Sequence, residues 1–247
     1  MLKSVLVAGL AAGLAVGIAP SAEAATNDLA ALVRYSPGAT TTSLDRAVHT
    51  AMKSTGKSRA TVIAQALAEA RASAAEARAT PVNAKAATGT VTILSSGGGT
   101  RTLGSATAKG DVFVSPASTL FIQHGHTGIY YALTAIVEAP GSGQKSRSIS
   151  ASSVTVGTGT VKQHVAVTQT KRDAAGAYAY SNLRGKEYNT NFAFNRDAYG
   201  TKMNCSQLVW ATYTIKAGID LDSNGGFGVY PYNIKDSSLT STYSTLS

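Results

Sequence analysis

The sequence predicts an α+β fold, in which an antiparallel sheet with packed helices is preceded by a helical N-terminal arm. From residue 88 onward, short segments of β-branched and aromatic residues alternate with turns rich in Gly and Ser. Helical patterns follow at 173–185 and 204–218, whereas residues 25–85 are rich in Ala and contain Tyr35 as their one aromatic residue. Strands followed by segregated helices are typical of the α+β class.

The first 24 residues have the pattern of a secretory signal peptide. Lys3 precedes an apolar run at residues 4–19, and Ala22-Glu23-Ala24 provides a cleavage site after Ala24. A run this short, ending at a cleavage site, is not typical of a membrane span. We therefore expect a secreted or cell-envelope protein with no integral membrane segment once the signal peptide is removed.

The charge indicates which partners the protein attracts. The 247-residue chain has a net charge of +9, which removal of residues 1–24 leaves unchanged because Lys3 and Glu23 cancel. A basic exported protein is attracted to anionic polymers. Because the basic residues are scattered and no basic run is interleaved with aromatics, we expect no nucleic-acid partner. An anionic cell-wall polymer such as peptidoglycan fits the expected compartment.

Residues 25–85 are expected to form a helical arm that acts as a propeptide, a linker or a wall-binding element. Leu44, Val48 and Met52 recur at a helical spacing, and Gly56 is a suitable helix stop. Residues 58–78 have the pattern of a second helix, which ends before Pro81. The apolar stripe is narrow, so we expect this hairpin to need support from another part of the protein.

Residues 86–247 are expected to form the second domain. Its segments alternate at a period of two or are rich in β-branched and aromatic residues, which predicts strands at 90–94, 110–115, 126–133, 135–139, 153–157 and 164–170. The Gly- and Ser-rich stretches 95–99 and 141–148 are predicted to be loops.

The one cysteine of the chain, Cys205, begins the helical pattern at 204–218. Asn204 is a suitable N-cap and Gln207 completes a capping box, which places Cys205 in the first turn. The unpaired N–H groups and the positive end of a helix dipole favour an anion there, so a thiolate is stabilised and an oxyanion could be bound. Cys205 is thus a candidate nucleophile, although a buried structural cysteine has the same sequence context.

A nucleophilic cysteine needs a base and a group that orients the base. His124 and His126 lie two apart in "QHGHTGIYY", so on a strand both side chains point to one side. Glu138 is the one acidic residue between Phe121 and Pro140, and it ends the strand predicted after that of His126. Side chains of neighbouring hairpin strands meet, so Cys205, His126 and Glu138 form a candidate trio.

Two patterns suggest a metal, but each is incomplete. His124 and His126 could be a metal pair, yet two ligands do not make a site. The stretch "DLDSNG" at 220–225 matches the first half of a calcium loop, but Pro231 stands where a bidentate Glu is needed. We therefore expect no metal and no cofactor.

The second domain resembles a known group of enzymes. "GDVFVS", "HTGIYY", "AIVEA", "LRGKEYNTNF" and "NCSQLVW" occur in the order typical of circularly permuted NlpC-type papain-like cysteine amidases and peptidases, the YiiX/YaeF-like group. The resemblance covers roughly residues 105–240 and implies a permuted papain-like domain. It implies that Cys205 is the nucleophile, His126 the base and Glu138 the orienting carboxylate. Asn204, Tyr188 and His124 are expected to support the site or its oxyanion, and Asn204 stands where the group leads us to expect an aromatic residue.

The sequence thus predicts a secreted thiol hydrolase that cleaves amide bonds, most plausibly in cell-wall peptides, through an acyl-enzyme. A thiol acyltransferase or lipid-ester hydrolase of the same fold is one alternative. A non-catalytic wall-binding module with a structural cysteine is another. We also expect that residues 25–85 could mask the site until they are removed.

Overall fold

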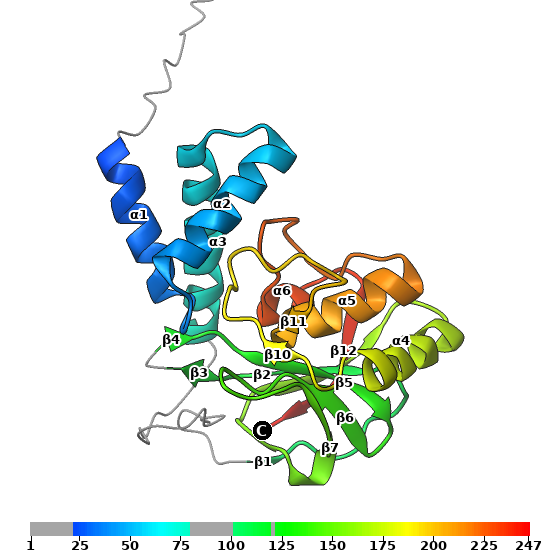
Figure 1. The fold of residues 1–247 in the computed structure, drawn as a ribbon. Coiled ribbons are helices and arrows are strands. Elements are labelled where there is room, and N and C mark those ends of the chain that lie inside the picture. The colour runs from blue at the N-terminus through cyan, green and yellow to red at the C-terminus, as the bar shows by residue number, and fades with distance from the viewer. Residues whose placement is uncertain (1–21, 80–100, 120–121) are drawn as a thin grey trace, which may run out of the picture.

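The computed structural model describes residues 22–79, 101–119 and 122–247 and shows a mixed α+β protein (Figure 1). Helices α1–α3 stand together beside one end of a sheet, and helices α4 and α5 lie on one of its faces. Most of the predicted signal peptide, the predicted strand at 90–94 and the loop at 95–99 lie outside the described residues. So does the predicted boundary at residue 86.

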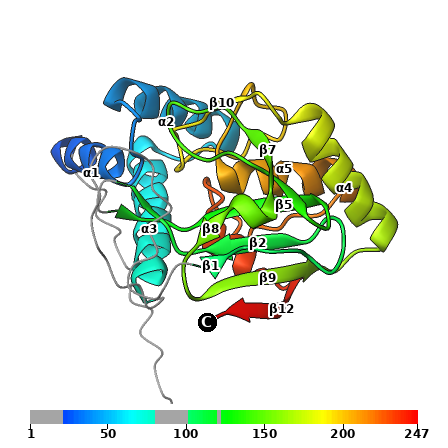
Figure 2. The ribbon, with the colours of Figure 1, turned by 90° about the horizontal axis from the view of Figure 1, so that it is seen from below.

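Six antiparallel strands form the central sheet, in the order β12-β9-β2-β5-β6-β7 (Figure 2). Their bounds are β2 Val112–Ser115, β5 His126–Ala132, β6 Ala135–Glu138, β7 Arg147–Ser150, β9 Thr160–Val165 and β12 Thr240–Leu246. The predicted strands at 110–115, 126–133 and 135–139 are therefore present. They lie side by side at the centre of the sheet, which places the ends of β5 and β6 next to each other.

Alternate residues of the central strands bury opposite faces of the sheet, as the two-residue period of a strand requires. The face toward α4 and α5 carries Val112, Ile129 and Val137. The opposite face carries Phe113, Tyr130 and Ile136, which pack with Leu103 and Val156. Both faces are covered, so the sheet is a rigid support for residues at its strand ends.

The helices of the second domain are α4 Gln169–Asn182, α5 Cys205–Ala217 and the short α6 Pro231–Lys235. Gly176 lets α4 approach β5 closely, since a Cβ there would lie 3.0 Å from the Tyr130 carbonyl oxygen. The strand predicted at 164–170 is wrong beyond Val165. Thr168 instead caps α4 by accepting a hydrogen bond from the Lys171 N–H, and this cap starts a helix where the apolar alternation ends.

Three short strand pairs complete the domain. They join β1 Arg101–Thr102 with β8 Thr155–Val156, β3 Ser118–Thr119 with β4 Ile122–Gln123, and β10 Glu187–Tyr188 with β11 Lys202–Met203. A 3₁₀ turn at Ala151–Ser153 precedes β8. The loop predicted at 141–148 is shorter than expected, because Arg147 and Ser148 begin β7 by pairing with β6.

The N-terminal arm is a three-helix unit, α1 Ala22–Arg34, α2 Thr41–Thr55 and α3 Arg59–Ala79. Thr40 caps α2, and Gly56 ends it with a positive φ of 69°, as its predicted role as a helix stop requires. Helix α1 was not predicted. Its Leu32 is fully buried and supplies the apolar surface that the predicted hairpin lacked.

The arm packs against the second domain through one apolar cluster. This cluster joins Leu29, Leu32, Leu44 and Ile63 of the arm to Phe192, Ala193, Cys205 and Tyr230. Among the helices that the structure describes, none has the length and hydropathy needed to cross a membrane.

Candidate active site

His126 and Glu138 meet at the adjoining ends of β5 and β6. The register places Gly128 opposite Glu138, so His126, two residues earlier, lies diagonally across on the same side of the strands. His126 Nε2 lies 2.8 Å from Glu138 Oε2. Both residues are buried, with relative exposures of 4% and 0%. The predicted contact between these two side chains is present.

Arg147 completes the surroundings of Glu138. It lies opposite Glu138 on β7, and its Nε and Nη2 donate to Glu138 Oε1 at 3.0 and 2.9 Å. Burial raises the pKa of the Glu138 carboxyl, but the hydrogen bonds and charges of His126 and Arg147 outweigh burial, and the net pKa is lowered. Glu138 is therefore an anion at neutral pH, with one oxygen assigned to each partner.

Cys205 is the first residue of α5, as its sequence context predicted. The Asn204 side chain accepts the Gln207 N–H at 2.9 Å, and the Gln207 side chain accepts the Asn204 N–H at 3.4 Å. This reciprocal pair is the predicted capping box, and it directs the first turn of α5 toward the sheet end.

The Cys205 side chain reaches His126. Burial lowers the pKa of His126, yet a side-chain hydrogen bond with Cys205, another with Glu138 and the charges of both raise it to about 10. Because Nε2 is engaged by Glu138, Nδ1 is the ring nitrogen left for the thiol. The structure thus brings Cys205, His126 and Glu138 together as one chain of contacts in which a cationic imidazole is stabilised.

Asn204 is fully buried, and its side-chain oxygen accepts several hydrogen bonds. Its Oδ1 accepts from Gln207 N, from Asn195 Nδ2 at 3.2 Å and from Ser206 Oγ at 3.3 Å. Its Nδ2 is buried and has no hydrogen-bond partner within the described part of the chain. An amide donor is therefore available immediately before Cys205.

Tyr188 lies near the thiol, at the end of β10. Burial, followed by the charge of Cys205, raises the pKa of Tyr188 well above its ordinary value. Its ring is 6.2 Å from that of Phe192, a member of the apolar cluster that contains Cys205. Tyr188 thus remains protonated beside the sulfur.

His124 lies next to the trio but has a different charge state. Its Nδ1 is 2.6 Å from the carbonyl oxygen of Gly125, and its ring is 5.7 Å from Phe192. Burial lowers the pKa of His124 to about 4, with a minor contribution from the charge of His126. His124 is therefore neutral at neutral pH.

Sequence reasoning missed Arg147 and Asn195. Arg147 lay in a stretch predicted to be a loop, and only the register of β6 with β7 shows that it faces Glu138. Asn195 is fully buried and accepts the Val229 N–H at 2.6 Å while donating to Asn204. A single Asn in an irregular stretch carries no signal in the sequence.

Neither of the two candidate metal patterns forms a set of ligands in the described residues. Asp220 and Asp222 of the calcium-like stretch form ion pairs with Arg196. Within residues 22–79, 101–119 and 122–247, no group of three or more His, Cys, Asp or Glu residues could hold a metal ion.

The site is covered in this structure. Cys205 is 1% exposed and belongs to the apolar cluster that the arm shares with Phe192 and Tyr230. A substrate can therefore reach the sulfur only when part of this cover moves.

The fold and the site define a mixed α+β protein with a buried Cys-His-Glu arrangement. No protein-family model matches the chain. It is 38% identical over 158 residues to the uncharacterized protein YycO of Bacillus subtilis (strain 168), and this match spans 63% of each of the two proteins. Among solved structures it is similar to the metalloprotein YiiX of Escherichia coli O157:H7, of DUF1105, with a TM-score of 0.39 and 12% identity. That match covers 56% of this chain and 97% of YiiX.

Proposed function

We propose that the protein is a cysteine hydrolase of amide bonds, with a permuted NlpC-type papain-like domain at residues 86–247. The observation that carries this proposal is the buried contact chain from Glu138 through His126 to Cys205, which raises the pKa of His126 to about 10. A histidine that stays cationic beside a thiol is the partner that a nucleophilic thiolate needs. The sequence resemblance to the YiiX/YaeF-like group supports the same roles.

In the proposed reaction, Cys205 Sγ attacks the carbonyl carbon of the scissile amide and the carbonyl electron pair moves to oxygen. The tetrahedral intermediate collapses, the C–N bond breaks, and the amine leaves with a proton from His126. The resulting thioester is attacked by water, which gives a proton to the now neutral His126. Collapse of the second intermediate releases the acid and restores the thiolate and the imidazolium.

Two donors are proposed to bind the oxyanion. One is the backbone N–H of Cys205 in the first turn of α5. The other is Nδ2 of Asn204, which is buried and lacks a partner in the described part of the chain. Preorganised donors of this kind stabilise the charge that develops on the carbonyl oxygen. Glu138 orients His126 and is itself oriented by Arg147.

The proposed substrate is a cell-wall peptide, with peptidoglycan as the first candidate. The predicted signal peptide supports a secreted or envelope location, and the net charge of +9 favours an anionic polymer. Residues 25–85 are proposed to be a propeptide-like arm, because they share the cluster that covers Cys205.

The ion pair can be tested in the full chain, even while the site is covered. Cys205 is the one cysteine of the chain. The ultraviolet absorbance of its thiolate is therefore obtained by subtracting the spectrum of Cys205→Ala from that of wild type. We expect wild type to show this difference signal and His126→Ala to lose it, because the proposed ion pair needs the imidazolium of His126. Amine release from peptidoglycan and from synthetic peptide amides is expected to vanish in Cys205→Ala, and unchanged release in that variant would refute the proposal.

The burial of Cys205 favours one alternative, a non-catalytic module with a structural thiol. Such a thiol would give no difference signal that depends on His126, and replacing it with Ser would leave binding to cell walls unchanged. The same absorbance measurement therefore separates the two functions.

A further inference from the structure

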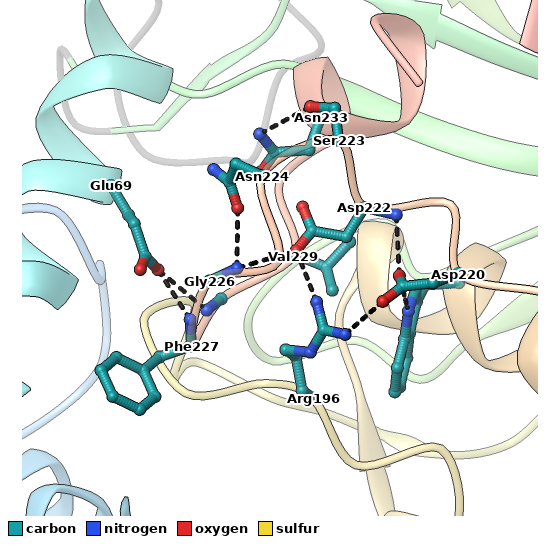
Figure 3. A network of polar contacts seen from close by, with 12 residues as sticks. Glu69, Arg196, Asp220, Asp222, Ser223, Asn224, Gly226, Phe227, Val229 and Asn233 are labelled. Atoms are coloured by element: carbon teal, nitrogen blue, oxygen red, sulfur yellow. Dashed lines mark hydrogen bonds and ion pairs between the residues drawn. The ribbon is translucent and has the colours of Figure 1, made fainter. Parts of the chain in front are cut away.

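A loop between α5 and α6 is held in shape by its own polar network (Figure 3). Arg196 forms ion pairs with Asp220 and Asp222, and Asp222 Oδ2 accepts the Gly226 N–H at 3.1 Å. Asp220 also accepts the indole N–H of Trp210 at 2.9 Å. All these groups belong to the second domain, so its own contacts fix the loop.

This loop presents two adjacent N–H groups to a carboxylate of the arm. The N–H groups of Phe227 and Gly228 donate to Oε2 of Glu69 on α3 at 2.8 and 3.2 Å (Figure 3). Gly226 permits the close approach, since a Cβ there would lie 2.3 Å from the Glu69 carboxylate. Successive N–H groups in a concave turn are a typical anion-binding arrangement. We call the N–H groups of Phe227 and Gly228 the cradle.

The ring of Tyr230 lies beside Gly228 of the cradle, and its hydroxyl is a donor that Glu69 does not engage. A Cβ built at Gly228 would lie 3.3 Å from Cζ of Tyr230, the atom that carries the hydroxyl. Tyr230 is 3% exposed, and its hydroxyl has no hydrogen-bond partner within the described residues. Burial and the nearby charge of Glu69 raise its pKa above the ordinary value, so the hydroxyl keeps its proton.

One hydrogen bond links the residue that follows the cradle to the residue that follows Cys205. The carbonyl oxygen of Val229 accepts a hydrogen bond from Ser206 Oγ at 2.7 Å, and Ser206 follows Cys205 in the chain. Tyr230 and Cys205 belong to the same apolar cluster, to which the arm also contributes. Movement of the arm that uncovers Cys205 would thus remove Glu69 from the cradle as well.

We propose that the cradle is a subsite for a carboxylate of the substrate, which Glu69 occupies while the arm covers the site, and that the Tyr230 hydroxyl becomes a further donor to the substrate. The substrates are then peptides with a carboxylate close to the scissile amide. Once Glu69 leaves, the two N–H groups are open to water or to another acceptor, and a substrate that covers them without accepting from them loses free energy. A substrate carboxylate restores those hydrogen bonds, whereas a neutral side chain restores them less well. This inference rests on the proposed function, because it assigns the substrate of the Cys205 site.

The subsite can be tested directly with propionate on the full-length Glu69→Ala variant, with propionamide as the neutral match. We expect propionate to shift the amide NMR signals of Phe227 and Gly228 saturably, and propionamide to leave them in place. Wild type, in which Glu69 fills the cradle, is expected to show neither shift. Glu76→Ala is the matched control, because Glu76 also lies on α3 but pairs with Lys235 at 3.1 Å, away from the cradle. Absence of a propionate shift in Glu69→Ala would overturn the subsite.

Substrate preference is the second measurement, and it separates failure of the subsite from failure of the proposed function. Paired peptides with Glu or Gln beside the scissile bond are compared in Glu69→Gln, which keeps the size of the side chain. We expect the Glu peptide to be cleaved with a kcat/KM about tenfold higher, and Tyr230→Phe to reduce that ratio. Cys205-dependent cleavage with a ratio near one would reject the subsite and keep the hydrolase. Propionate binding with no Cys205-dependent cleavage would reject the hydrolase and keep the anion site.

Discussion

Arg147 and Glu138 face each other across β6 and β7, and the guanidinium of Arg147 donates both of its hydrogen bonds to the same carboxylate oxygen. The second oxygen of Glu138 is therefore left for His126. Because each carboxylate oxygen of Glu138 has its own partner, the two partners fix the orientation of the carboxylate. A bidentate pair of this kind depends on the planar fork of arginine, which lysine lacks.

The Arg147→Met variant tests this support. The lowered pKa of Glu138 contributes stability that is present above its ordinary value of 4.5 and is lost as pH falls through the lowered pKa. We expect Arg147→Met to lose about 1–2 kcal/mol at neutral pH, a figure reduced by solvent screening of the half-exposed arginine. Urea unfolding from acid to neutral pH should show the difference shrinking on acidification. Lys145→Met, which removes an exposed pair with Glu187, should change little.

The charge on His126 predicts an alkaline loss of stability. Its pKa is raised from 6.5 to about 10, so its contribution is fully present below pH 6.5 and is lost as pH rises through 10. The free energy of unfolding of wild type should therefore fall more steeply over this window than that of His126→Ala. Urea unfolding at several pH values measures both curves. Parallel curves would show that His126 is not cationic in the folded protein.

The Asn204→Ser variant separates capping from oxyanion binding. Ser retains an oxygen that can cap α5, so we expect the thermal midpoint to fall only by the few degrees that the lost contact with Asn195 costs. Nδ2, however, is lost, and removal of one oxyanion donor typically lowers kcat by about 10²–10³-fold. We expect that loss in kcat with a smaller change in KM. A variant with unchanged kcat would assign Asn204 to capping alone.

Gly128→Ala tests the close packing beneath the site. A Cβ at this position would lie 2.8 Å from Phe113 Cε1 and 2.9 Å from the Val137 carbonyl oxygen, so one of them must move. We expect a loss of about 1–3 kcal/mol in the free energy of unfolding, the usual cost of overpacking a core. The exposed substitution Thr134→Ala is the control. An unchanged urea midpoint in Gly128→Ala would contradict this packing.

Local patterns predicted the parts of the site that local interactions determine. The N-terminal cap of α5 is set by Asn204 and Gln207, which lie within or next to the helix, and the predicted capping box is present. His126 and Glu138 are joined by a short hairpin, so their approach followed from the strand pattern. Their assignment as base and orienting carboxylate remains a prediction.

Long-range placement could not be predicted in the same way. The contact of Arg147 with Glu138 depends on a strand register, and the contact of Glu69 with Phe227 joins residues that lie 158 positions apart. The stretch 164–170 was misassigned because its apolar alternation reaches Val167, directly before the Thr168 cap that starts a helix. Neither side-chain spacing nor composition shows whether such a segment continues a strand or is capped as the start of a helix.

The apolar cover over Cys205 also bears on the lifetime of the thiol. Oxidation of cysteine to sulfenic and higher acids follows thiolate character and exposure, and the last of these steps are irreversible. Cys205 is 1% exposed in the apolar cluster that the arm shares with the second domain, so it is shielded from peroxide in solution, whatever its charge. Because the chain has no second cysteine with which to form an internal disulfide, the contacts that bury this sulfur are also what limits its oxidation.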